Sequence, residues 1–243
     1  MLSGKTIVFL PGMDGTGLSF EPLGKILPQD INVEIIQYPT DRLLNFKETV
    51  QWAKDQIQSD QKDLIVLAES FSGPVAIDLI GSGQLKANCL ILCATFARSP
   101  RPILFKVLRC LPLDLIIRLP FPKSLFRHFI EGGDQATELF INMWQRVKTL
   151  VPARVLVHRL KIISRVDVRE RLSSLPVPCL YIQAASDRSV PPSSLFDFVE
   201  LVPDLRVKRI KGPHFILQAQ PLASLHAIHH FVGLITTATA DGG

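Results

Sequence analysis

The chain alternates between short, continuous apolar runs and segments in which apolar residues recur at helical spacing. Short apolar runs rich in Val, Ile and Leu are typical of strands buried on both faces of a parallel sheet. We expect six such strands, at 5–10, 32–37, 64–68, 89–93, 178–183 and 206–210. Helices are expected between them, at 19–27, 45–59, 73–81, 193–201 and 222–235. The pattern predicts an α/β fold with a mostly parallel sheet flanked by helices.

Residues 97–175 interrupt this alternation, because they contain no convincing strand pattern. Apolar segments punctuated by proline come first, and a helical pattern follows through 138–144. We therefore expect a core made of residues 1–96 and 176–236. Residues 97–175 would form a helical insertion on top of the sheet, with one apolar face packed over the functional site. The small, weakly patterned residues 237–243 are expected to fray.

Composition favours one large core, since 47% of the 243 residues are hydrophobic and mean hydropathy is +0.25. The sequence contains no run of about 18 or more uncharged apolar residues, so no membrane span is expected. The first residues have no pattern of a signal peptide. The cysteines lie in apolar runs without metal-binding spacing, which predicts buried, reduced thiols and a cytoplasmic protein; they are Cys89, Cys93, Cys110 and Cys179.

Positive charge is concentrated in the insertion. Between Arg98 and Arg171 there are 15 Lys and Arg against 6 Asp and Glu, although the whole chain carries only +5. One interpretation is a solvated helical face. The other is a surface that attracts an anionic partner, such as an acidic carrier protein, a lipid headgroup or an anionic substrate. Nucleic acid is not indicated, because no recognised module or aromatic pattern accompanies the charge.

A candidate nucleophile stands between the third strand and the helix after it. Ser70 is bracketed by small residues, with Ala68 before it and Ser72 and Gly73 after it. A chain that turns sharply from a central strand into a helix brings backbone segments close together, so only small side chains fit there. This is the form of a nucleophile elbow, which exposes a serine hydroxyl above the sheet.

Two further residues complete the set that an activated serine needs. Asp187 follows the strand at 178–183, and His214 follows the strand at 206–210. Both would emerge at the sheet edge where Ser70 lies, in the chain order serine, acid, histidine. We therefore predict a triad in which His214 is the base and Asp187 orients it.

Other residues compete for these roles. Ser72 is a second candidate nucleophile, although Pro74 fits a tight turn after it poorly. Asp197 falls inside a predicted helix, and an aspartate after a strand can also be a turn former or helix cap. The remaining histidines have surface or packing roles as the simpler interpretation; they are His128, His158, His226, His229 and His230.

Acyl transfer from such a serine also needs two N–H donors for the oxyanion. The Phe71 N–H, next after the nucleophile, is one candidate. The Met13 N–H, in the glycine-rich loop after the first strand, is the other. Gly12 beside it would let backbone approach a substrate, or serve only as a turn residue.

Together, the segments 10–17, 68–73, 186–191 and 212–214 resemble the α/β-hydrolase superfamily over nearly the whole chain. The layout is similar to small bacterial carboxylesterases, including esterases that act on pimeloyl-carrier-protein methyl ester. Two departures stand out: Pro11-Gly12 replaces the His-Gly of many relatives, and the family's first two strands are missing.

The resemblance implies hydrolysis of carboxylic esters of short to medium acyl chains through an acyl-enzyme on Ser70, without a metal or organic cofactor. Its pocket would be lined by Gly12, Met13, Phe71, Phe215 and cap residues. A serine at the elbow argues against a dehalogenase, which uses a carboxylate there. Thioester hydrolysis, acyl transfer and carrier-linked ester hydrolysis with the basic cap docking an acidic carrier remain open, as does a non-catalytic binding scaffold.

Overall fold

The computed structural model describes residues 2, 4–57, 63–108, 110–119 and 133–240. All six expected strands are present, and every pairing between neighbours is parallel. They form one sheet in the order β2-β1-β3-β4-β5-β6. Their bounds are β1 Thr6–Leu10, β2 Asn32–Ile35, β3 Leu64–Glu69, β4 Cys89–Cys93, β5 Cys179–Ala184 and β6 Leu205–Ile210.

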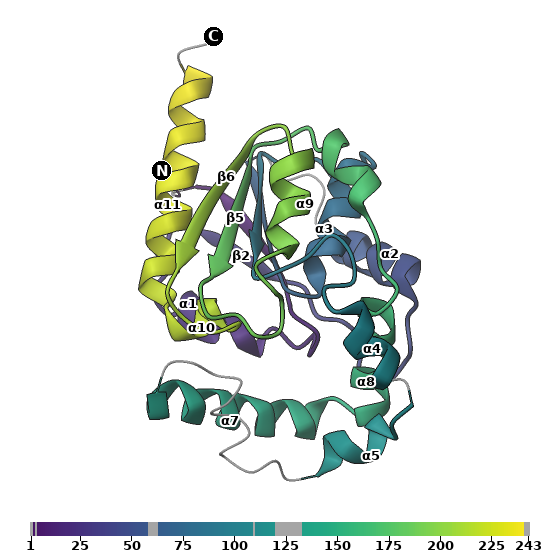
Figure 1. Ribbon diagram of the computed structural model, residues 1–243. Coiled ribbons are helices and arrows are strands. Elements are labelled where there is room, and N and C mark those ends of the chain that lie inside the picture. The colour runs from purple at the N-terminus through teal and green to yellow at the C-terminus, as the bar shows by residue number, and fades with distance from the viewer. Residues whose placement is uncertain (1, 3, 58–62, 109, 120–132, 241–243) are drawn as a thin grey trace.

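Helices cover both faces of this sheet (Figure 1). One face carries α2 Phe46–Gln56, α3 Ser72–Gly81 and α9 Ser194–Leu201. The other carries α1 Glu21–Gly24, α10 Ile216–Ala219 and α11 Pro221–Ala240. The helix expected over 19–27 is wrong in extent: a 3-10 turn, η1 Leu18–Phe20, leads into the single turn of α1, which ends at Gly24.

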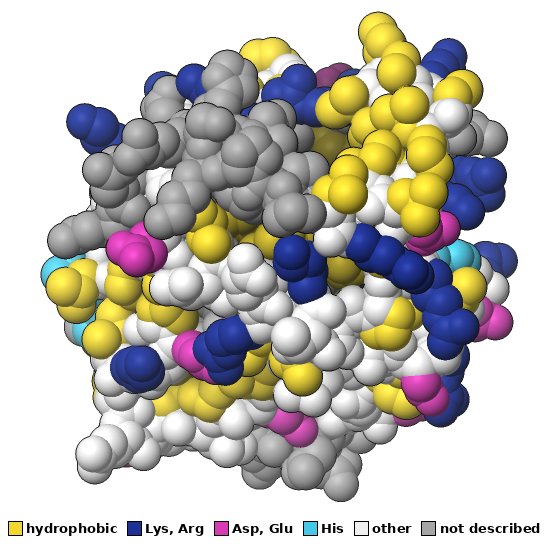
Figure 2. Space-filling model, turned by 90° about the horizontal axis from the view of Figure 1, so that it is seen from below, with side chains coloured by type: hydrophobic (Ala, Val, Ile, Leu, Met, Phe, Trp, Pro, Cys, Tyr) yellow, Lys and Arg dark blue, Asp and Glu magenta, His cyan; other side chains and the backbone are white. Residues whose placement is uncertain are grey.

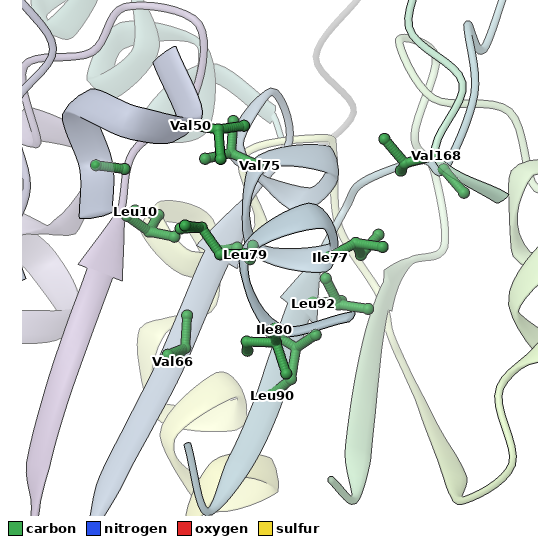
Figure 3. Close-up of a cluster of buried hydrophobic side chains, with 14 of the residues drawn as sticks. Leu10, Val50, Val66, Val75, Ile77, Leu79, Ile80, Leu90, Leu92 and Val168 are labelled. Atoms are coloured by element: carbon green, nitrogen blue, oxygen red, sulfur yellow. The ribbon is translucent and has the colours of Figure 1, made fainter. Parts of the chain in front are cut away.

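The strand side chains divide between two cores, one on each face of the sheet. In β1, Val8 and Leu10 point to the α2 and α3 side, whereas Ile7 and Phe9 point to the α11 side. The same alternation continues in β3 and β4, because successive side chains of a strand leave opposite faces. Figure 3 shows the first core, where Val75 and Leu79 of α3 lie near β1, β3 and β4. Ser70 therefore leaves a strand buried on both sides.

Most of the insertion lies beyond the carboxyl ends of the strands (Figure 1), with α4 Pro102–Leu108, α5 Leu113–Arg118, α7 Gly133–Leu150 and α8 Ala153–Ile163. Its last element, the 3-10 helix η2 Arg169–Ser174, instead packs beside the C-terminal end of α3, where the Ser174 hydroxyl donates to the Gly81 carbonyl. A small core of Val147, Val151, Val155 and Leu156 joins α7 to α8 and receives Met13 from the loop after β1. The insertion is thus packed against the edge where the predicted site residues emerge. Some of the expected proline-punctuated apolar segments fall within 120–132, which lie outside the described residues.

Two expectations need correction. Helix α11 continues to Ala240, so residues 237–240 are helical where fraying was expected, while 241–243 lie outside the described residues. Cys89, Cys93 and Cys179 are buried free thiols, but Cys110 is exposed. Its apolar neighbours belong to a surface stretch of the insertion, and a buried strand has the same local composition.

Within the described part of the chain, no helix is both long and apolar enough to cross a membrane.

Candidate active site

Ser70 occupies a strained turn between β3 and α3. Its φ is 49°, in the left-handed region that L residues rarely adopt. The Ser70 N–H donates to the carbonyl of Cys93 at 2.9 Å, and the Thr95 hydroxyl donates to the Ser70 carbonyl. A Cβ on Gly73 would overlap the Thr95 side chain, so a glycine is required there for the turn to close. Neighbouring β4 and its following loop therefore hold the serine in this conformation.

A chain of hydrogen bonds connects three distant segments at this edge of the sheet. His214 Nε2 lies 3.0 Å from Ser70 Oγ, and His214 Nδ1 lies 2.7 Å from Asp187 Oδ2. The other oxygen of Asp187 accepts from the N–H groups of Ser189 and Val190, both at 2.8 Å. With its proton on Nδ1, the imidazole donates to Asp187 and can accept the proton of Ser70.

Burial and charge act in opposite directions on the pKa of His214, whose side chain is only 11% exposed. Burial lowers the pKa, but the Asp187 carboxylate raises it by charge and by hydrogen bonding, and buried Glu69 adds to the increase. The result is a pKa above the ordinary imidazole value. The ring is therefore a stronger proton acceptor than a free histidine.

The competing candidates lie elsewhere. Ser72 is fully buried, where its hydroxyl bonds Tyr38 at 2.7 Å and the Pro11 carbonyl. Asp197 pairs with Arg98 at 3.0 Å. His158 contacts the Leu44 carbonyl at 3.0 Å. His226, His229 and His230 lie on α11, and His128 lies outside the described residues. Among the residues that the structure describes, no group of three or more His, Cys, Asp or Glu could hold a metal ion.

The loop after β1, residues 11–17, approaches the serine closely. A Cβ built on Gly12 would lie 4.0 Å from the Ser70 Cβ. In the described chain, neither the Met13 N–H nor the Phe71 N–H donates to another protein group. Both N–H groups are therefore left available to a bound group, as an oxyanion site requires.

Arg159 of α8 holds the 11–17 loop from the insertion side. Its guanidinium donates to the carbonyls of Met13 at 2.9 Å, Asp14 at 2.6 Å and Pro39 at 3.0 Å, and lies 5.6 Å from the Tyr38 ring centre. Burial lowers its pKa from the ordinary arginine value. No sequence motif marked Arg159, although it stands four residues from both Val155 and Ile163. An arginine within the apolar stripe of a helix was the feature of the sequence that could have indicated a buried role for Arg159.

Glu69, directly before the serine, was also missed. Its buried carboxyl accepts from the Ser19 hydroxyl at 2.8 Å and from Gln218 at 3.0 Å, and Gln218 also donates to the Ser19 carbonyl. Burial raises the pKa of Glu69. This network joins η1, β3 and α10 beneath the serine, and no spacing in the sequence indicated it.

A cavity of about 280 Å³ opens beside Ser70 and His214. Gly12, Met13 and Phe215 line it together with residues that the insertion contributes. Those are Pro100, Phe105, Phe140, Met143, Trp144, Val147, Leu160 and Ile163. Phe71 is a correction: its ring is 2% exposed and packs edge-on against Tyr38, because the α3 turn points it into the core. Most of the wall is apolar.

Comparison with known proteins by sequence gives one distant relative. No protein-family model matches the chain. The chain is 28% identical over 127 residues to phytyl ester synthase 1, chloroplastic, of Arabidopsis thaliana. That match covers 49% of this chain and 18% of the relative, so the chain spans less than a fifth of that protein's length.

Comparison by structure identifies the fold. A bromoperoxidase from Bacillus anthracis superposes with a TM-score of 0.75 at 17% identity, covering 95% of this chain and 92% of that one. An esterase from Exiguobacterium antarcticum gives 0.74 at 13% identity, covering 97% and 93%. The chain has the α/β-hydrolase fold, which confirms the predicted fold class. A fold hosts many chemistries, so the activity is argued from the site.

Proposed function

We propose that this protein is a serine hydrolase that cleaves carboxylic esters through an acyl-enzyme on Ser70. The observation that carries the proposal is the hydrogen-bonded series Ser70, His214 and Asp187 on the wall of an apolar cavity. Nucleophilic acyl transfer requires a hydroxyl, an imidazole that can take its proton and a carboxylate that orients the imidazole, in this order.

In the proposed reaction, Ser70 Oγ attacks the acyl carbonyl while His214 Nε2 takes its proton. Asp187 stabilises the resulting imidazolium through the bond from Nδ1. The N–H groups of Met13 and Phe71 would donate to the oxyanion, and each such donor stabilises the transition state by about 3 kcal/mol. His214 then returns the proton to the leaving alcohol. Water repeats the attack, releasing the acid and restoring Ser70.

The substrate class follows from the cavity. Aromatic and aliphatic side chains from the insertion form most of its wall, with the reacting groups at one side. Such a wall favours an apolar acyl group of short to medium length, because burying it removes apolar surface from water. Residues 97–175 would accordingly select the substrate, while the sheet supplies the chemistry.

Active-site labelling combined with turnover tests the proposal. A fluorophosphonate probe is expected to label the parent protein on Ser70 and to leave Ser70→Ala unlabelled, with Ser72→Ala as the matched control. p-Nitrophenyl esters of increasing acyl length are expected to be hydrolysed, with a maximum at one length. Absence of both labelling and turnover would favour a non-catalytic binding scaffold.

Transfer of the acyl group to an alcohol is a second candidate, favoured by the distant relative. That relative is named as an ester synthase, and the same acyl-enzyme can be attacked by an alcohol in place of water. Adding a long-chain alcohol during turnover distinguishes the two. Formation of the new ester at the expense of free acid would support transfer, and free acid alone would support hydrolysis. A thioester substrate series separates thioesterase activity in the same assay.

A further inference from the structure

The outer face of α4 and α5 exposes aliphatic side chains where a folded protein normally presents polar ones. Of the 16 large hydrophobic side chains that the described residues expose, six lie between 103 and 119. Ile103 is 79% exposed and Leu115 is 61% exposed. We call this the α4–α5 surface, and its residues are Ile103, Leu104, Val107, Leu111, Leu115 and Leu119.

The exposure is systematic along the segment. Ile103 and Val107 stand one turn apart on α4, Leu115 and Leu119 stand one turn apart at α5 and its C-cap, and Leu111 lies in the turn between the two helices. Neither α4 nor α5 contains a buried residue. Phe105, on the other side of α4, lines the Ser70 cavity. A short helix that is apolar on both faces has one partner inside the molecule and calls for a second outside it.

Basic residues accompany this surface. Lys106 and Arg118 are exposed within it, and Asp114 is the one acid between residues 103 and 119. Most arginines elsewhere in the insertion are occupied, as in the pairs of Arg98 with Asp197 and Arg146 with Glu21. By contrast, Lys106 and Arg118 form no ion pair within the described chain. Figure 2, which views the molecule from below, shows hydrophobic side chains gathered at its upper right with Lys and Arg beside them.

We infer that the α4–α5 surface docks on an anionic lipid surface, with the aliphatic side chains entering the headgroup layer and Lys106 and Arg118 facing the lipid charge. The chemistry favours lipid over a protein partner, since protein interfaces concentrate binding energy in Trp, Tyr and Arg, and none of the six residues is aromatic. Aliphatic residues flanked by cations are the features of helices that lie in a membrane interface.

Docking in this way would be peripheral, because the side chains would enter only the headgroup layer. It would also bring the helix that carries Phe105, and hence one wall of the cavity, to the lipid. The inference does not depend on the proposed ester hydrolysis, because binding is measured without turnover.

Vesicle sedimentation tests the inference. The parent protein is expected to sediment with vesicles of phosphatidylcholine and phosphatidylglycerol in equal amounts, and much less with phosphatidylcholine alone. Ile103→Gln combined with Leu115→Gln should weaken partitioning by at least about tenfold, because two buried apolar side chains are lost. Phe196→Gln combined with Leu222→Gln is the matched control, since both side chains are also more than 60% exposed but lie on α9 and α11.

Charge reversal supplies the second arm. Lys106→Glu combined with Arg118→Glu should also reduce binding to the mixed vesicles by about tenfold or more. The matched control, Lys86→Glu with Lys208→Glu, should change it little. Hydrolysis of a soluble p-nitrophenyl ester should be unchanged in the Ile103 and Leu115 variant, because neither residue lines the cavity.

Three outcomes would overturn the inference. One is a parent protein that does not sediment with the mixed vesicles, and another is a control pair that loses as much binding as the test pair. Alternatively, an acidic acyl carrier protein could bind through Lys106 and Arg118 while vesicles do not, which would assign the surface to a protein partner. A parent protein that sediments with the mixed vesicles but hydrolyses no ester would count against the proposed function alone.

Discussion

The two ends of the Ser70 cavity are built in different ways. On the sheet side, every residue of β1, β3 and β4 is buried, and the turn at Ser70 is held by neighbouring backbone and by Thr95. On the insertion side, α4, which contributes Phe105 to the wall, contains no buried residue. The sheet side can therefore hold the reacting atoms in place for chemistry, whereas α4 contributes surface that can change with little cost to the fold.

The largest expected difference between the two regions is in turnover. Ser70→Ala should reduce kcat by at least about 10⁴-fold for every acyl length, because removal of the nucleophile abolishes the acyl-enzyme route. Steady-state kinetics on p-nitrophenyl esters measures this. A variant that kept the parent's rate would refute the assignment of Ser70.

Arg159 tests the contact between the regions. Arg159→Lys should lower kcat by about 10- to 100-fold with little change in KM, because a compact ammonium cannot span the three carbonyls that the planar guanidinium joins, and the Met13 N–H then moves. Affinity for a boronic acid that mimics the tetrahedral intermediate should fall in parallel. Arg154→Lys, on the same helix but exposed, is the control. Loss of thermal stability without loss of inhibitor affinity would make Arg159 merely structural.

Packing beneath the turn should respond in stability. Gly73→Ala places a methyl group on the Thr95 side chain and should lower the free energy of unfolding by about 2 kcal/mol or more, roughly 30-fold in the folding equilibrium. Gly24→Ala, which meets nothing within 4 Å, should be neutral or slightly stabilising. Urea denaturation followed by circular dichroism compares them. Equal stability of both variants would contradict the tight approach of Gly73 to Thr95.

The insertion should instead control selectivity. Phe105→Ala enlarges the cavity from a half-buried position on α4. It should move the preferred acyl length upward and change the ratio of kcat/KM between long and short esters by about tenfold, the scale of one methylene group in a hydrophobic pocket. Thermal unfolding should change little. A uniform loss for all lengths would mean that the insertion supports the chemistry and not the choice of substrate.

The smallest expected effect is in the pH profile. Because His214 must be neutral to accept a proton and its pKa is raised, kcat/KM should fall on acidification at a pH above the ordinary imidazole value of about 6.5. Glu69→Gln removes one negative charge that raises this pKa, so the acid limb should move to lower pH. A limb that stayed in place would show that Glu69 is protonated throughout the range.

Most of the sheet could be predicted from the sequence, because continuous Val, Ile and Leu runs have few alternatives to buried parallel strands. The meeting of Ser70, Asp187 and His214 could be anticipated for a related reason: each follows a parallel strand, and the carboxyl ends of such strands share one edge. The cavity wall could not be anticipated in this way. Which faces of α4 and α7 turn inward depends on packing between segments far apart in sequence, and local periodicity does not record it.

The positions of two individual side chains could not be predicted from the sequence either. The Phe71 ring points into the core because the turn at Ser70 fixes its direction, which composition does not reveal. Arg159 is buried only because three carbonyls of distant loops converge on it.

The unequal burial of the four thiols has a practical consequence. Burial raises the pKa of Cys89 and Cys179 to about 12 and that of Cys93 well above its usual range, so these sulfurs stay protonated and shielded. Cys110 alone among them is exposed, immediately before Leu111. The native polypeptide thus offers a single attachment point for a maleimide dye, placed where a change in local polarity would report contact with a bilayer without any engineered cysteine.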